Sequence, residues 1–180
     1  MRKPLLLLGS FVSWLIALLL IVSAGLPERA IYTGVSQGDG PRVAPEIGSL
    51  APPFQAATLD GSIDSARLLG QPLLLNFWAT WCAPCALEMA ELQRLHETLQ
   101  SAVVIGVNLG ESASAVSAWA EAYHLTFDLV VDPGGSIARL YALRGQPSTY
   151  VIAPDGTIRH IFFGAADAAA FIEALLPLIG

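Results

Sequence analysis

Two cysteines stand where an apolar, strand-like run gives way to a helical pattern, and this arrangement limits the fold more than any other feature of the chain. Residues 73–78 read LLLNFW, a mostly apolar run typical of a strand buried on both faces. Cys82 and Cys85 follow, and Pro84 between them suits the first turn of a helix, where no N–H is needed. The pattern predicts a buried strand, a short loop and a helix that begins at Cys82 or Ala83.

The rest of the chain alternates between strand and helix patterns. Asp60-Gly61 and Pro154-Asp155-Gly156 are turn signals between short apolar runs. This order predicts an α/β sandwich over residues 48–180, with a mixed central sheet flanked by helices. The expected strands are 54–59, 73–78, 103–108, 127–131, 149–152 and 157–162, and the expected helices are 82–99, 113–123, 136–141 and 166–178.

A long apolar stretch precedes this domain. Residues 5–26 contain no charged side chain and are long enough to cross a membrane as one helix. The two basic residues of the short segment 1–4 predict a cytoplasmic amino terminus and a domain on the outer face. We therefore predict a transmembrane signal-anchor at 5–26 and, because residues 27–47 carry Gly, Pro and Ser without periodicity, a tether there. A signal peptide cleaved after Ala24 is the alternative, and it gives the same compartment.

Charge and cysteine content exclude some classes of protein. The formal net charge is −6, and the basic residues after the apolar stretch are scattered arginines. Nucleic acid is therefore not an expected partner, because binding phosphates needs clustered Lys and Arg. The chain has only two cysteines, three positions apart, so no disulfide framework staples the fold.

The position of the two thiols indicates redox chemistry. The amino end of a helix offers unpaired N–H groups and the positive end of the helix dipole, so Cys82 is expected to have a lowered pKa. Cys85, one turn further, would be shielded and able to resolve a mixed disulfide. Two buried core cysteines and a metal site are the alternatives. Zinc would need two further ligands, and the dispersed histidines do not form a paired site, so we expect no metal or other cofactor. The three histidines of the chain are His96, His124 and His160.

Three segments match motifs of one known family. The first, LLNFWATWCAPC at 74–85, is followed by Glu88 in a WCxPCxxE pattern. The others are VNLGES at 107–112 and GQPSTY at 145–150. Together they resemble the thioredoxin superfamily and, more narrowly, its membrane-anchored ResA/TlpA/CcmG group of thiol-disulfide reductases. The resemblance covers residues 48–180 and implies a thioredoxin-like fold with a redox-active disulfide between Cys82 and Cys85.

The resemblance also implies roles for individual residues. Cys82 and Cys85 would be catalytic, with Glu88 near them influencing thiol protonation. Asn76 stands where cytoplasmic thioredoxins carry a buried Asp that helps to move protons, a role that Glu88 could take over. A solvated surface position is the alternative for Glu88, because Glu is seldom buried unpaired. The expected substrate-binding surface consists of Trp81, which would cover the cysteine pair, Ala83, Pro84, Gln146 and Pro147, with a cis peptide bond before Pro147.

The implied activity is reduction of protein disulfides outside the cytoplasm. Ala-Pro between the cysteines lacks the histidine of strongly oxidising Cys-Pro-His-Cys proteins, which favours a reductant. The resemblance implies the haem-attachment CxxC of apocytochrome c as a substrate and a transmembrane thiol-electron carrier of the CcdA or DsbD kind as the electron donor. Reduction for copper-site assembly and general periplasmic disulfide reduction or isomerisation are alternatives within the same chemistry. A metal-binding chaperone and a peroxidase of the related peroxiredoxin group are alternatives from other classes.

Overall fold

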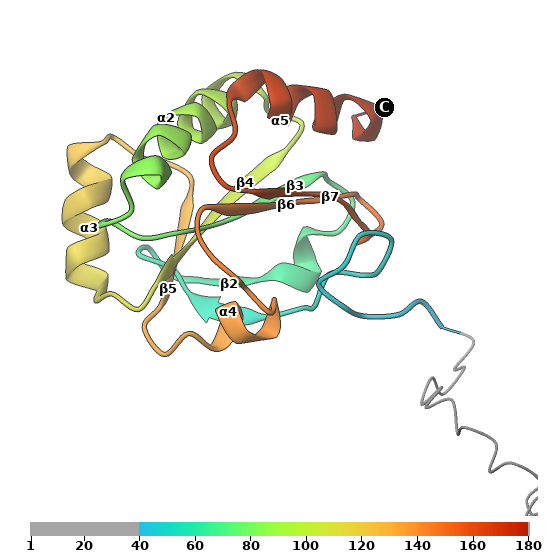
Figure 1. Ribbon diagram of the computed structural model, residues 1–180, viewed down its shortest axis with the longest axis horizontal. Helices are drawn as coiled ribbons and strands as arrows, with labels where there is room; N and C mark the ends of the chain where they lie inside the picture. The colour runs from blue at the N-terminus through green and yellow to red at the C-terminus, as the bar shows by residue number, and fades with distance from the viewer. Residues whose placement is uncertain (1–39, 180) are drawn as a thin grey trace, which may run out of the picture. The chain divides into compact units, whose positions relative to one another are not determined.

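A five-stranded mixed sheet forms the centre of the protein (Figure 1). The structure is a computed structural model that describes residues 40–179. The strands of the sheet are β3 (Leu73–Trp78), β4 (Val103–Leu109), β5 (Asp128–Asp132), β6 (Ser148–Ile152) and β7 (Ile158–Phe163). They lie in the order β5-β4-β3-β6-β7, so β3 is central. β3, β4 and β5 run parallel, whereas β6 is antiparallel to both β3 and β7, which confirms the predicted mixed sheet.

Both faces of the sheet are covered. One face packs against three helices, which are α2 (Ala83–Thr98), α3 (Ala113–Ala122) and α5 (Ala168–Leu175). The other packs against α4 (Ser136–Leu140) and a two-stranded hairpin of β1 (Gln55–Ala57) and β2 (Ser62–Asp64). Short 3-10 turns at Ser65–Leu68 and Leu176–Leu178 complete the described elements. Figure 1 shows α2 and α5 on one side of the sheet and α4 on the other.

The composition of β3 follows from this layering. All six of its residues are buried. Leu74 and Trp78 belong to the core beneath α2 and α5, whereas Leu75 and Phe77 belong to the core on the opposite face. Because successive side chains of a strand point to opposite faces, a strand with two covered faces needs a nearly continuous apolar run. The structure therefore confirms the predicted central strand at 73–78.

The compact unit begins earlier than the sequence indicates. It spans Pro41–Gly180, whereas the sequence assigns residues up to 47 to the tether. The Ala44 N–H donates to the Leu50 carbonyl at 3.0 Å, and Val43 bridges to Leu50, so this segment pairs with the domain. Composition alone does not show such a contact. The predicted membrane span at 5–26 lies outside the described residues, and no helix within residues 40–179 is long and apolar enough to cross a membrane.

Gly106 in β4 allows the indole of Trp78 to pack against the sheet. A Cβ at this position would lie 2.9 Å from Leu129 Cδ2, 3.0 Å from Trp78 Nε1 and 3.2 Å from Phe127 Cε2. We expect Gly106→Ala to lower the free energy of unfolding by about 1–3 kcal/mol, because these buried side chains must shift. Urea unfolding measures the change. Gly134→Ala is the matched control, since its Cβ would meet nothing within 4 Å. An equal effect of both variants would contradict the explanation.

Candidate active site

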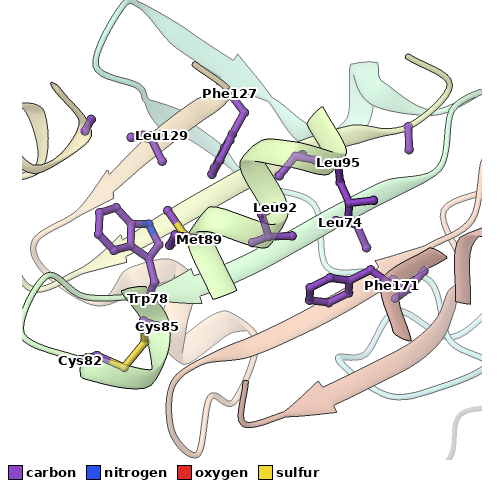
Figure 2. Close-up of a cluster of buried hydrophobic side chains, with 14 of the residues drawn as sticks. Leu74, Trp78, Cys82, Cys85, Met89, Leu92, Leu95, Phe127, Leu129 and Phe171 are labelled. Carbon is purple, nitrogen blue, oxygen red and sulfur yellow. A yellow bond between two sulfur atoms is a disulfide. The ribbon is translucent and has the colours of Figure 1, made fainter. Parts of the chain in front are cut away.

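The cysteine pair forms a disulfide at the amino end of α2 (Figure 2). Cys82 is the N-cap residue, and its carbonyl accepts the Cys85 N–H at 3.0 Å. A thiolate at this position is stabilised by the unpaired N–H groups and the dipole of the helix. Cys82 is 6% exposed and Cys85 is fully buried. A partner therefore reaches the pair through Cys82, and Cys85 is shielded as the sequence predicts.

A glutamate just after the neighbouring strand β4 holds the loop before Cys82. The Glu111 carboxylate accepts the Thr80 N–H at 2.8 Å, the Thr80 hydroxyl at 2.5 Å and the Asn108 Nδ2 amide at 2.7 Å. Burial alone raises the pKa of Glu111, but these hydrogen bonds together outweigh it and hold the pKa below its ordinary value. Glu111 therefore stays ionised at neutral pH and fixes the backbone two residues before Cys82.

Removing this carboxylate should loosen the active-site loop. We expect Glu111→Ala to lower the free energy of unfolding by about 1–2 kcal/mol, because three donors lose their acceptor. We also expect roughly ten-fold slower reduction of hydroxyethyl disulfide, because the Cys82 sulfur is held less firmly. Glu111→Gln should recover most of both losses, since an amide oxygen still accepts from the Thr80 N–H and the amide N–H can donate to the Thr80 hydroxyl. Equal defects in the two variants would show that charge matters here and positioning does not.

The loop before β6 lies beside the same end of β3. Ser148 pairs with Phe77 in the sheet, so Pro147 lies next to the strand end that leads to Cys82. The Gln146–Pro147 peptide bond is cis, which confirms that prediction, and the Pro147 carbonyl accepts the Gly164 N–H at 2.9 Å. Pro147 is buried and Gln146 is half-buried. The two predicted substrate-binding segments are thus brought to one edge of the sheet.

Glu88 lies in a buried polar cluster beneath the active site. Its carboxylate accepts the Asn76 Nδ2 amide at 2.7 Å, the Ala166 N–H at 3.1 Å and the Thr149 hydroxyl at 3.4 Å. Its side chain has no exposed surface, which decides against the alternative of a solvated surface residue. Burial raises the pKa of Glu88 to about 7, although the hydrogen bonds from Ala166, Asn76 and Thr149 each lower it. A carboxyl that titrates near neutral pH therefore stands one helical turn after Cys85.

The three remaining candidates for substrate contact lie on the surface. Ala83 and Pro84 are exposed in the first turn of α2. Trp81 was expected to cover the cysteine pair, but 71% of its surface is exposed, whereas the neighbouring Trp78 is fully buried. The loop thus directs Trp81 to solvent, where it is available to a partner.

Sequence reasoning left out one residue that the structure brings to the site. Glu111 lies in the VNLGES motif, but from the sequence alone a carboxylate at the start of a helix needs no role in the active site, because it interacts favourably with the helix dipole. Its contact with Thr80 joins residues 31 positions apart, so no local pattern indicates it. Within residues 40–179, no group of three or more His, Cys, Asp or Glu side chains is placed to hold a metal ion.

Comparison with known proteins supports the same chemistry. The family model described as "AhpC/TSA family" matches residues 47–161. The chain is 36% identical over 133 residues to the thiol:disulfide interchange protein DsbE of Pseudomonas aeruginosa, covering 70% of this chain and 73% of that protein. It is 31% identical over 170 residues to the thiol-disulfide oxidoreductase ResA of Geobacillus thermodenitrificans, covering 90% and 93%.

Solved structures show the same fold. The crystal structure of StoA from Bacillus subtilis superposes with a TM-score of 0.62 at 26% identity, covering 69% of this chain and 98% of that one. The segment matched by the family model, residues 47–161, includes the strand, loop and helix that carry the cysteine pair. The chain therefore belongs to the thioredoxin-like AhpC/TSA family and, within it, to the thiol-disulfide oxidoreductases of the ResA and DsbE type.

Proposed function

We propose that this oxidoreductase reduces protein disulfides on the outer face of a cell membrane, with the haem-attachment CxxC of apocytochrome c as its substrate. The observation that carries the proposal is the Cys82–Cys85 disulfide at the start of α2, beside the Gln146–Pro147 loop. The Gln146 N–H makes no backbone hydrogen bond within residues 40–179, so it is available to an extended substrate segment.

The exchange proceeds in two steps from the reduced protein. The Cys82 thiolate attacks one sulfur of the substrate disulfide, forming a mixed disulfide, and the other substrate sulfur leaves and takes up a proton. Cys85 then loses its proton and attacks the Cys82 sulfur, which forms the Cys82–Cys85 disulfide and releases the second substrate thiol. The substrate gains two electrons, and the protein loses two.

Glu88 is suited to take the proton of Cys85. It follows Cys85 by three residues on the same helix, so the two side chains lie on neighbouring faces. A base with a pKa near 7 accepts and returns a proton readily at neutral pH. In this role Glu88 would take the place of the buried Asp that cytoplasmic thioredoxins carry at the position of Asn76, because the Asn76 amide does not titrate.

The electrostatics favour a reductant. A protein that stabilises its reduced thiolate is a strong oxidant, because the disulfide form is then less stable by comparison. Ionised Glu88 and Glu111 both follow the cysteine pair in sequence, Glu88 one turn further along α2 and Glu111 hydrogen-bonded to Thr80 in the loop before Cys82. Their negative charges oppose thiolate formation. The Ala-Pro dipeptide between the cysteines adds no positive charge.

The compartment and the electron donor complete the proposal. Its support is the uncharged stretch 5–26 with basic residues before it, which suits an anchor that leaves the domain outside the cytoplasm. A reductant in an oxidising compartment must be recharged. The resemblance to ResA-like proteins favours a transmembrane thiol-electron carrier of the CcdA or DsbD kind as the donor.

The redox potential of the pair tests the direction of electron flow. The full chain, purified in a mild detergent, is equilibrated with defined thiol buffers, and the reduced fraction is followed by Trp fluorescence. We expect a value close to the thioredoxin potential of about −270 mV, together with reduction of a disulfide-bonded CxxCH peptide. A value close to the DsbA potential of about −120 mV would instead identify an oxidant of thiols and overturn the proposal.

A further inference from the structure

One arginine near the active site, Arg144, has no side-chain partner among residues 40–179. Six arginines and no lysine lie in residues 40–179, against thirteen Asp and Glu. Arg144 is exposed and makes no hydrogen bond or ion pair within this range. The other five are held: Arg42 by Glu46, Arg67 by Asp64, Arg94 by Glu91, Arg159 by Asp155, and Arg139 by the Gly134 carbonyl. In an acidic domain, an unpaired guanidinium is available to an external anion.

Arg144 lines a shallow hollow of about 350 Å³ beside the proline loop. Gln146, Pro147 and Gly164 form part of its wall, and Phe163 at the end of β7 forms another part. Phe163 is 70% exposed, although a large aromatic side chain gains free energy when it is covered. The hollow therefore offers an aromatic surface and a cation side by side. It is continuous with the loop that the proposed function assigns to the substrate.

The sheet topology places opposite charges on the two sides of β3, the strand that leads to the disulfide. β4 and β6 flank β3 on opposite sides. Because β4 is parallel to β3, its end and Glu111 lie at the edge of the sheet where β3 leads to Cys82. Because β6 is antiparallel, its start and Arg144 lie at the same edge. A segment that crosses this edge meets a carboxylate on one side and a guanidinium on the other.

We propose that the hollow between Arg144 and Phe163 is a specificity subsite for polypeptide disulfides whose cysteine is flanked by an apolar and an acidic residue. The apolar side chain covers Phe163, and the carboxylate pairs with the guanidinium, which binds carboxylates in a planar, two-pronged geometry. Glu111 on the other side disfavours an acidic group there, so the charges also fix the direction in which the segment lies. The inference rests on the proposed function, because it names the preferred substrate of that site.

Charge-matched peptides test the subsite. In the full chain carrying Cys85→Ser, Cys82 forms a mixed disulfide that acid quenching and mass spectrometry can count. The probes are CxxC disulfide peptides with a Leu-Glu or a Leu-Lys flank, placed before the disulfide in one pair and after it in the other. In one of the two pairs, we expect the Glu peptide to form the mixed disulfide roughly two- to five-fold faster than the Lys peptide at low ionic strength. Exposed ion pairs have effects of this order. Arg144→Glu should reverse that preference, and added salt should weaken it.

The controls separate the subsite from general charge and from the proposed function. Arg42→Glu makes the same charge change near the start of β7, at the opposite end of that strand from Phe163, and should leave the Glu-to-Lys ratio unchanged. Phe163→Ala should slow the Leu-flanked peptides roughly three- to ten-fold relative to Ser-flanked ones. If Arg144→Glu leaves the Glu-to-Lys ratio unchanged in both pairs, or if Arg42→Glu reverses it equally, the proposed subsite is refuted. The proposed reductase function is not affected by either result. If neither these peptides nor hydroxyethyl disulfide react with the reduced wild-type protein, the proposed function itself fails.

Discussion

Cys82→Ser is expected to lower the rate of disulfide reduction by more than about 10³-fold, since the exchange has no other accessible nucleophile. Cys82 carries the exposed surface of the pair, and Cys85 is fully buried. A serine hydroxyl at the N-cap position still suits the helix, so the fold should be retained. Turnover of a disulfide-bonded peptide measures the loss, and far-UV circular dichroism checks the fold.

Cys85→Ser is expected to give the complementary result. The Cys82 thiolate can still attack a substrate, but no second thiol is available to resolve the mixed disulfide. The variant should therefore accumulate one substrate chain for each protein chain, visible by mass spectrometry and released by dithiothreitol. The variant with both cysteines replaced by serine is the control and should trap nothing. Full turnover by Cys85→Ser would refute the two-step mechanism.

Besides the loss of activity on replacing the cysteines, a large effect is expected on the pH dependence of stability, and its source is Glu88. Burial raises its pKa in the folded protein to about 7 from the ordinary value of 4.5, so the folded state binds the proton more tightly than the unfolded state. Stability is therefore highest below about pH 4.5 and falls as the pH rises to about 7. The shift corresponds to a loss of about 3 kcal/mol across this range relative to Glu88→Gln, which does not titrate.

Urea unfolding of both proteins between pH 4.5 and pH 8 measures this difference. Glu173→Gln, which removes a charge from an exposed position of α5, is the control and should follow the wild type. The rate of exchange should also change near pH 7 in the wild type, and this inflection should disappear in Glu88→Gln. Parallel stability curves for wild type and Glu88→Gln would mean that burial does not raise this pKa.

Local patterns in the sequence determined most of the fold. The mostly apolar run at 73–78 indicated a strand covered on both faces, and all six of its residues are buried. Pro84 and the spacing of leucines after it indicated a helix whose start carries both cysteines, and α2 begins at Ala83. These signals extend over only a few neighbouring residues, so they can be recognised in the sequence.

The tertiary structure alone decided how the site is supported. Whether Glu88 is solvated or buried depends on Ala166, which lies 78 positions away and donates its N–H to the carboxylate. Asn76 and Thr149 meet across 73 positions, and Thr80 meets Glu111 across 31. Such contacts follow from strand order and helix packing, which place distant segments at one edge of the sheet. Local sequence periodicity does not indicate them. The sequence determined where the thiols stand, and the packing of distant segments decided which groups hold them and exchange their protons.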